Sequence, residues 1–189
     1  MKLYKSVLII PLFSIFFCAG TVRPFFPGNY FLEDKTYQNK SLGFSLTFRG
    51  NWDIVTDPNE MKDSKSFFKD LHDVGAELLF SGFTIEKTQG TRAIVTHLNE
   101  TNREYADEIR NINKDQIDVD SGCADITING KEFSTWRYKK NDFWFVEYFF
   151  SVDTYNIRVA FWTKPKLFDK FVPVYDQIMG TLILPTSNK

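Results

Sequence analysis

Two charged residues stand in the most apolar part of the sequence, and their chemistry needs an explanation. Glu147 lies inside the run Phe143–Phe150, and Arg158 lies inside the next apolar run, Ile157–Trp162. A carboxylate in an apolar strand is costly to bury unless a partner of opposite charge is at hand. We therefore expect Glu147 and Arg158 to pair on one face of a β-sheet.

Aromatic side chains accompany this pair in the predicted register. Because successive side chains of a strand point to opposite faces, one face collects the candidate ligand-binding residues. These are Trp136, Tyr138, Phe145, Glu147, Arg158 and Trp162. Aromatic walls around a charged pair can hold a small polar ligand. The alternative is that a helix covers this face and the ion pair is satisfied inside the protein.

No catalytic residue is predicted. The sequence places no second acid, base or nucleophile beside Glu147, so we do not expect it to act as a general acid or base. It also has no Walker loop, dinucleotide fingerprint, nucleophile elbow, His-Glu-x-x-His or paired-cysteine motif. We predict no cofactor.

Two weak metal-binding patterns are better explained without metal. His72 falls late in a predicted helix and His97 at the end of a predicted strand, where we expect solvated or capping residues. A shared zinc site would require the two to meet with an acidic ligand. The segment Asp118–Gly122 is similar to the start of a calcium loop, but the later acidic ligands are missing, which favours a turn at a strand entry. We predict no metal.

Four strands joined by tight turns must position the charged pair. Asn129-Gly130 is a strong hairpin signal, because a type I′ turn requires positive φ at both central residues. Lys140-Asn141 and Asp153-Thr154 are the predicted second and third turns. The strand containing Phe143–Phe150 is apolar on both faces, so both faces must be covered.

The remaining elements surround this four-strand unit. Further strands are predicted at 43–48, 52–55, 78–85 and 93–97, with Gln89-Gly90 as a turn before the last of them. Asp57 begins one predicted helix, which Gly75 ends. Thr101 to Glu104 form a capping box before a second helix, whose apolar stripe is Tyr105, Ile109 and Ile112. A third helix is predicted from Pro165 to Met179.

The amino-terminal segment, residues 1–20, has the features of an export signal. Lys2 and Lys5 give a positive start, Val7–Phe17 is a short apolar run, and Cys18-Ala19-Gly20 supplies small residues for cleavage. The apolar run is short for a transmembrane helix. We therefore expect an exported protein, located in the periplasm or at the cell surface.

Three fates of this segment stay open. Cleavage near Ala19 or Gly20 would release a soluble protein, lipidation of Cys18 would give a lipoprotein, and an uncleaved segment would anchor the chain. Ile15, three residues before the cysteine, is similar to lipoprotein signals, whereas Phe17 stands where a small residue is usual.

The charge balance excludes some partners. The net charge is -1, and the loss of two lysines with the signal would make it -3. No basic stripe is present, so we expect neither nucleic acid nor an anionic membrane surface as a partner. Membrane contact is expected only through a lipid anchor at Cys18.

Once Cys18 is removed or lipidated, Cys123 is alone and makes no intramolecular disulfide. No neighbour would stabilise its thiolate, so we expect a buried, unreactive thiol opposite Trp136.

The opening of the folded region resembles that of the PsbP/Mog1-like family. The similarity lies in Tyr37-Gln38-Asn39, then Gly43-Phe44-Ser45-Leu46, then Trp52, followed by the same order of elements to Leu184. The proline that usually precedes the tryptophan is replaced by Arg49-Gly50-Asn51. The resemblance implies a central antiparallel sheet with helices on both sides, and members that act as binding or assembly modules rather than enzymes.

These observations predict an α+β protein, an α/β/α sandwich in which helices flank both faces of a central antiparallel sheet. Residues 1–20 are the signal peptide, 21–36 a linker, 37–185 the PsbP/Mog1-like domain and 186–189 a tail. The expected function is that of an exported, non-enzymatic binding or assembly module of the bacterial cell envelope, with a protein or envelope component as partner. The alternative is a small-ligand-binding or hydrolase-like protein that uses the aromatic face around Glu147 and Arg158.

Overall fold

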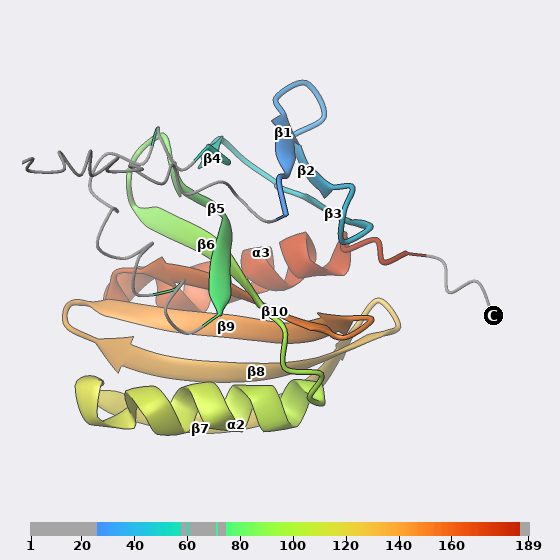
Figure 1. Ribbon diagram of the computed structural model, residues 1–189. Coiled ribbons are helices and arrows are strands. Elements are labelled where there is room, and N and C mark those ends of the chain that lie inside the picture. Colours follow the sequence, from blue (N-terminus) through green and yellow to red (C-terminus); the bar gives the residue numbers. More distant parts are fainter. Residues whose placement is uncertain (1–25, 58–59, 61–70, 72–74, 186–189) are drawn as a thin grey trace, which may run out of the picture.

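The computed structural model describes residues 26–57, 60, 71 and 75–185, and the strands among them form two antiparallel sheets (Figure 1). The predicted export signal with Cys18, most of the helix predicted between Asp57 and Gly75, His72 and the predicted tail lie outside the described residues.

The larger sheet has seven strands in the order β4-β5-β6-β10-β9-β8-β7. Their bounds are β4 Trp52–Val55, β5 Ala76–Thr84, β6 Gln89–Thr96, β7 Val119–Ile128, β8 Lys131–Lys140, β9 Phe143–Val152 and β10 Tyr155–Thr163. Strands β7 to β10 form the predicted four-strand meander, and every pairing in this sheet is antiparallel.

The turns of the meander follow from residues that accept positive φ. Asn129 and Gly130 have φ of 49° and 74°, as the predicted type I′ turn requires. The Asp153-Thr154 turn is also confirmed, since Tyr155 pairs with Val152. The second turn is Asn141-Asp142 rather than Lys140-Asn141, because Lys140 pairs with Phe143 as the last residue of β8. The one-residue difference leaves the faces of β9 unchanged.

The predicted turn at Gln89-Gly90 is wrong. Both residues belong to β6, and the chain turns earlier, between Ile85 and Thr88. Gly90 serves a different purpose, because it lies beneath the Trp162 ring of the neighbouring strand β10. A Cβ at position 90 would come within 2.1 Å of that indole. The glycine therefore allows close approach of a side chain and does not reverse the chain.

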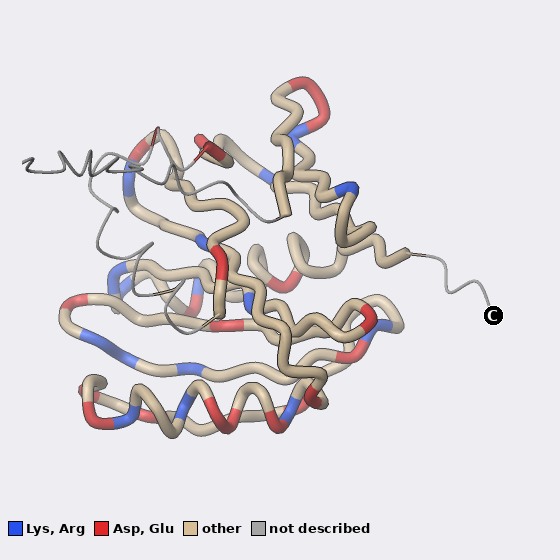
Figure 2. The backbone as a smooth tube through the Cα atoms, in the orientation of Figure 1, with Lys and Arg blue, Asp and Glu red and all other residues tan. Residues whose placement is uncertain are grey.

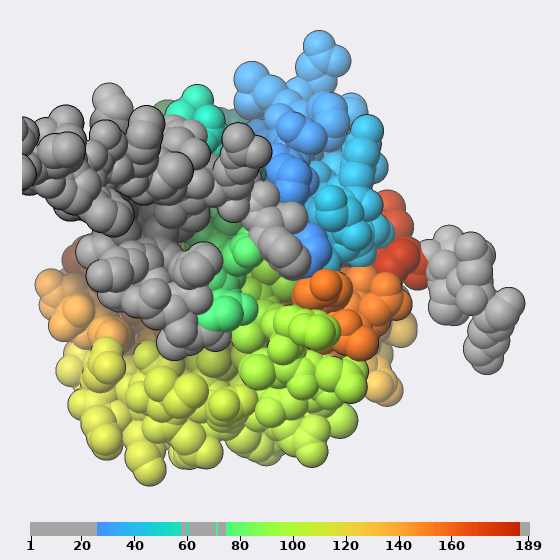
Figure 3. Space-filling model, viewed as in Figure 1, coloured from blue at the N-terminus to red at the C-terminus, as the bar shows by residue number. Residues whose placement is uncertain are grey.

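Helix α2, Asn102–Asn113, packs on one face of the sheet. The predicted capping box is confirmed, with Thr101 and Glu104 bonded reciprocally. Tyr105 and Ala106 are buried against Trp136, Tyr138 and Phe149 of the sheet. Figure 1 shows the helix alongside β7 and β8, and Figure 3 shows it at the surface of the molecule.

The predicted stripe of α2 is wrong at Ile112, which is 63% exposed. The four-residue spacing from Tyr105 through Ile109 continues to Asn113, so position 112 turns to solvent. A short 3₁₀ turn, η1 Lys114–Gln116, follows the helix. Charged residues of both signs alternate along the exposed side of α2 (Figure 2).

The other face of the sheet carries the main core. Val146, Tyr148 and Phe161 are buried there with residues of helix α3, Phe168–Gly180, which follows the 3₁₀ turn η2, Pro165–Leu167. Phe161 stacks on Tyr175 at 4.7 Å between ring centroids. The two faces of the meander therefore carry the residues that the alternation predicted.

A three-stranded sheet shares this second core with α3. Its strands are β1 Asn29–Phe31, β2 Thr36–Asn39 and β3 Phe44–Thr47. Phe44 meets Phe150 of β9 edge to face at 5.6 Å, and Tyr37 lies 4.7 Å from Phe80 of β5. Strand β1 falls within residues 21–36, the range assigned to a linker. The described residues thus form mostly antiparallel sheet with two helices.

Replacing Gly90 with alanine tests the close approach. Overpacking of this kind costs roughly 1–3 kcal/mol of unfolding free energy, because the indole of Trp162 must move. We expect Gly90→Ala to lower the denaturation midpoint in urea, and we expect this cost to disappear in a Trp162→Leu background. An equal cost in both backgrounds would contradict the role assigned to the ring.

Candidate functional site

Glu147 lies in a row of residues that face one another across neighbouring strands, and the charged Arg92 is at one end of this row. In this row Arg92 of β6 is opposite Ala160 of β10, Ala160 is opposite Glu147 of β9, and Glu147 is opposite Trp136 of β8. Ala160 is small and 1% exposed, so the strand between Arg92 and Glu147 carries no bulky side chain. Arg92 can therefore reach across β10 to the carboxylate.

The Glu147 carboxylate is 1% exposed and has three partners. The Tyr138 hydroxyl donates to Oε1 at 2.7 Å. Arg158 Nη1 lies 3.4 Å from Oε2, and Arg92 Nη2 lies 3.7 Å from Oε1. The predicted pairing of Glu147 with Arg158 is confirmed. The contributions of Arg92 and Tyr138 to the carboxylate were not predicted.

The pKa values of Tyr138 and Arg158 are raised, so both side chains keep the protons with which they bind the Glu147 carboxylate. Burial raises the pKa of Tyr138 well above its usual range, and the nearby charge of Glu147 raises it further. Burial is the largest single influence and by itself would lower the pKa of Arg158, but the attraction and hydrogen bond of Glu147 together with Tyr105 and Tyr138 outweigh it, and the pKa is raised. Tyr138 therefore stays a neutral hydrogen-bond donor and Arg158 a cation at neutral pH.

Aromatic rings form the row next to the charged one. Phe83 of β5 meets Trp162 at 5.8 Å between centroids, and Trp162 meets Phe145 at 5.7 Å. Phe145 stacks on Tyr138 at 4.9 Å, and Tyr138 stacks on Trp136 at 4.0 Å. The row crosses five adjacent strands, β5, β6, β10, β9 and β8, and Gly90 of β6 supplies the gap over which Trp162 lies.

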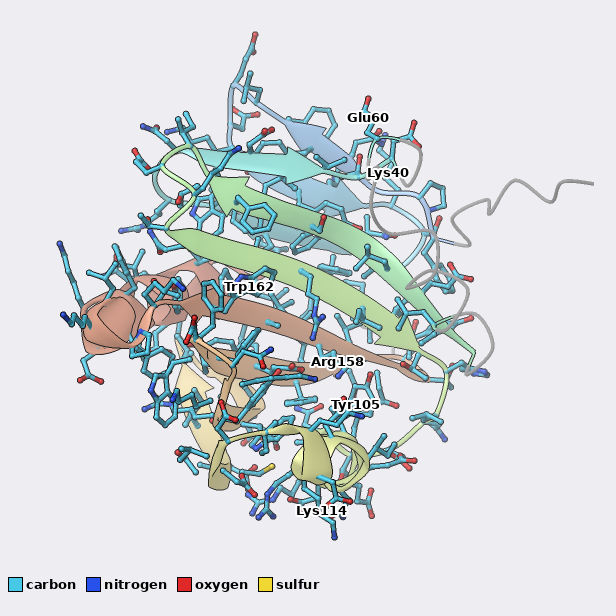
Figure 4. The ribbon with its side chains drawn as sticks, turned by 90° about the vertical axis from the view of Figure 1, so that its left-hand side faces the viewer. Lys40, Glu60, Tyr105, Lys114, Arg158 and Trp162 are labelled. Carbon is cyan, nitrogen blue, oxygen red and sulfur yellow. The ribbon has the colours of Figure 1, made fainter. Side chains whose placement is uncertain are left out.

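A pocket of about 390 Å³ opens where α2 gives way to η1. Its lining is Arg92, Asn113, Gln116, Ile117, Tyr138, Lys140, Asn141, Phe143, Phe145, Glu147 and Arg158. Figure 4 shows Arg158 on β10 between Trp162 of the same strand and Tyr105 of α2. Among the described residues, then, α2 covers one part of the aromatic face and leaves another part as a concavity.

The six candidate residues are on one face, but they divide into two groups. Tyr138, Phe145, Glu147 and Arg158 line the pocket. Trp136 does not, because it is 1% exposed and its indole N–H donates to Asp120 Oδ1 at 3.0 Å.

Trp162 supports the pocket wall through Phe145 without lining the pocket. Arg92 was missed because Gly90 suggested a turn at this point, and no sequence signal pairs β6 with β10.

The side chains with weak metal or nucleophile patterns have other contacts. Asp120 is bound by Arg110 at 2.6 Å and by the Gly122 backbone N–H, within a bulge that follows the predicted strand entry. His97 Nε2 lies 3.0 Å from the Thr154 hydroxyl. In the part of the chain that the structure describes, no cluster of three or more His, Cys, Asp or Glu side chains is placed to hold a metal ion.

Cys123 is a free thiol directly opposite Trp136, as predicted. Burial raises its pKa to about 12, and the neighbouring carboxylate of Asp107 adds to the shift. A thiol with this pKa holds its proton at neutral pH and is a poor nucleophile. This agrees with the unreactive thiol expected from the sequence, but the side chain is only partly buried.

Comparisons with known proteins place the fold. No protein-family model matches this sequence, and no curated protein matches it. The structure is similar to the solution structure of cyanobacterial PsbP (CyanoP) from Synechocystis sp. PCC 6803. The TM-score is 0.54 at 9% identity, over 79% of this chain and 91% of that chain. A crystal structure from Bacteroides thetaiotaomicron VPI-5482 matches with a TM-score of 0.43 at 10% identity, over 77% of this chain and 46% of that chain. The fold is PsbP-like, as the resemblance implied.

A double-mutant cycle on Glu147 and Arg158 tests the buried pair. Removing one partner of a buried ion pair costs roughly 3–5 kcal/mol, whereas replacing both can be near neutral. We expect Glu147→Gln and Arg158→Met each to lower the unfolding free energy, and the double variant to lose less than their sum. Because Arg92 and Tyr138 remain on Glu147, Arg158→Met should fall at the lower end of that range.

The matched control for this cycle is an ion pair exposed to water. Arg103 and Asp107 are joined at 3.0 Å on the exposed surface of α2, where Arg103 also lies 3.4 Å from Asp125 of β7. The cycle Arg103→Met with Asp107→Asn should show weak coupling, since solvent screens both charges. Equal coupling in the two cycles would refute a special role for burial at Glu147.

Proposed function

We propose that this protein is an exported, non-enzymatic binding or assembly module of the bacterial cell envelope. The supporting observation is the pocket beside Glu147. Charged and aromatic side chains line it, and the carboxylate of Glu147 already has partners within the protein. A general acid or base must reach its reactant, and Glu147 is 1% exposed with Tyr138 and two arginines on its oxygens. The arrangement favours holding a partner over transforming it.

The PsbP-like fold adds to this proposal. We propose that the domain is an α/β/α sandwich, with α2 on one face of the seven-stranded sheet and α3 on the other. The family that the opening motifs resemble consists of binding and assembly modules. The partner we propose is a protein or another envelope component, and nucleic acid is not proposed.

Export rests on the amino-terminal segment. The positive start, short apolar run and small residues of 1–20 support a signal peptide, with Cys18 as a site of lipidation. No helix in the described residues is long and apolar enough to cross a membrane. We place the mature protein in the periplasm or at the cell surface, with any membrane contact through Cys18.

A second candidate function is small-ligand binding in the pocket. Its size of about 390 Å³ and its aromatic and charged lining favour this candidate. The hydrolase-like variant of this function has less support, because it would require a second catalytic group beside Glu147.

Intact-mass analysis of the protein purified from its own host tests export. We expect a chain that has lost its first residues, because a signal peptidase removes the segment that carries Lys2 and Lys5. A mass that starts at Cys18 with added acyl chains identifies a lipoprotein, and a mass that starts near Thr21 identifies a soluble exported protein. A chain that still begins with Met1 would contradict processing.

Affinity capture of the full chain from the native envelope tests the binding role. The comparison is between wild type and a pocket variant carrying Arg92→Gln and Phe145→Ala, with Arg103→Gln on the exposed side of α2 as control. We expect the same envelope component with wild type and control, and its loss with the pocket variant. Thermal melting confirms that all three are folded. Equal capture by all three proteins would contradict the binding role of the pocket. Hydrolysis of an ester substrate by the wild-type protein that Glu147→Gln abolishes would contradict the non-enzymatic role.

A further inference from the structure

The pocket beside Glu147 carries more positive than negative charge. Arg92, Lys140 and Arg158 contribute three cations to its lining, and Glu147 is the carboxylate among them. Charges in such a concavity interact more strongly than in bulk water, because the low-dielectric walls concentrate the field. The lining therefore carries a formal excess of two positive charges.

We propose that this pocket binds a small organic anion, a carboxylate or phosphate group attached to a ring. This inference rests on the proposed binding function and names the chemistry of the ligand. Arg158 and Lys140 hold the anionic group, and Arg92 adds positive charge to the lining. The aromatic wall at Phe145 receives the ring.

Arg158 has a donor to spare for an anion. Its guanidinium carries five N–H donors, and the ion pair with Glu147 uses Nη1. Arg158 Nε is buried and makes no hydrogen bond within the described part of the chain. A buried donor normally has a partner. A carboxylate or phosphate oxygen is the acceptor that best fits a guanidinium edge.

The rest of the lining suits a ring. Phe143, Phe145 and Ile117 give an apolar wall, and the volume of about 390 Å³ is that of a small-molecule site. Phe145 is held flat against Tyr138, with 1° between the ring planes. A wall fixed in this way loses little freedom when a ligand packs on it.

A hydrogen bond at the mouth of the pocket links strand β8 to the 3₁₀ turn η1. Lys140, at the end of β8, donates from Nζ to Gln116 Oε1 of η1 at 3.1 Å. Basic residues mark this end of β8 in Figure 2. Lys140 thus presents its charge at the entrance, where it can attract an anion and hold it.

Titration of the processed protein from its own host with four probes tests the inference. Benzoate and phenyl phosphate carry ring and anion, benzamide is the neutral isostere of benzoate, and inorganic phosphate lacks the ring. We expect saturable binding of benzoate or phenyl phosphate at low salt, by isothermal titration calorimetry, and affinities about tenfold lower for benzamide and inorganic phosphate. The tighter of the two ring anions identifies the anionic group. No saturation, or benzamide binding as tightly as both ring anions, would overturn the proposal.

Charge variants distinguish a ligand site from a structural ion cluster. Lys140→Gln should weaken ring-anion binding about fivefold at unchanged thermal stability, since Lys140 is at the mouth of the pocket. Lys139→Gln is the matched control, because the adjacent side chain points to the other face of β8. Glu147→Gln should tighten binding by removing the competing carboxylate. Equal effects of Lys139→Gln and Lys140→Gln would sink the idea.

The two proposals can fail separately. Envelope capture that succeeds without binding of either ring anion leaves the binding module intact and refutes the ligand class. Ring-anion binding without any captured component refutes the assembly role and supports the ligand class.

Discussion

A carboxylate buried in the middle of an apolar sheet sets the conditions for the rest of this structure. Glu147 needs counter-charge and hydrogen bonds inside the protein, and its partners come from three strands, β6, β8 and β10. Arg92 reaches it only because the intervening residue is Ala160. In the next row, Gly90 makes room for Trp162 in the same way. Small residues on β6 and β10 thus decide where the large and charged side chains of this face can lie.

The length of α2 determines how much of the sheet face around Glu147 is shielded from solvent. The helix covers Trp136 and Phe149 with Tyr105 and Ala106, and then ends at Asn113. Beyond that point Gln116 of η1 contributes to the pocket lining, so the charged cluster has a side covered by α2 and a side open to the pocket. One set of interactions can therefore both stabilise the sheet and present donors to a ligand.

Local patterns predicted the meander, the capping box and the Glu147–Arg158 pair, because each depends on residues close in sequence or on simple alternation. Gly90 shows the limit of such patterns. A glycine before a strand is typical of a turn, and only the position of Trp162 on β10 explains it. The contribution of Arg92 could not be predicted for the same reason, since it requires the pairing of β6 with β10. Of the small sheet only β3 was predicted, and β1 and β2 were missed because these short strands are stabilised mainly by contacts with the main core.

The pairing of β6 with β10 also has a consequence for how the chain folds. The meander closes by turns of two residues, whereas Thr91 of β6 donates to the backbone oxygen of Ala160, 69 residues along the chain. Closing the longer loop costs roughly 3 kcal/mol more in chain entropy. We expect β8, β9 and β10 to assemble first, with β10 as a temporary edge strand until β6 arrives. The charged Arg158 and Glu147 on that sheet would then discourage pairing with another chain, as charges on edge strands do in finished proteins.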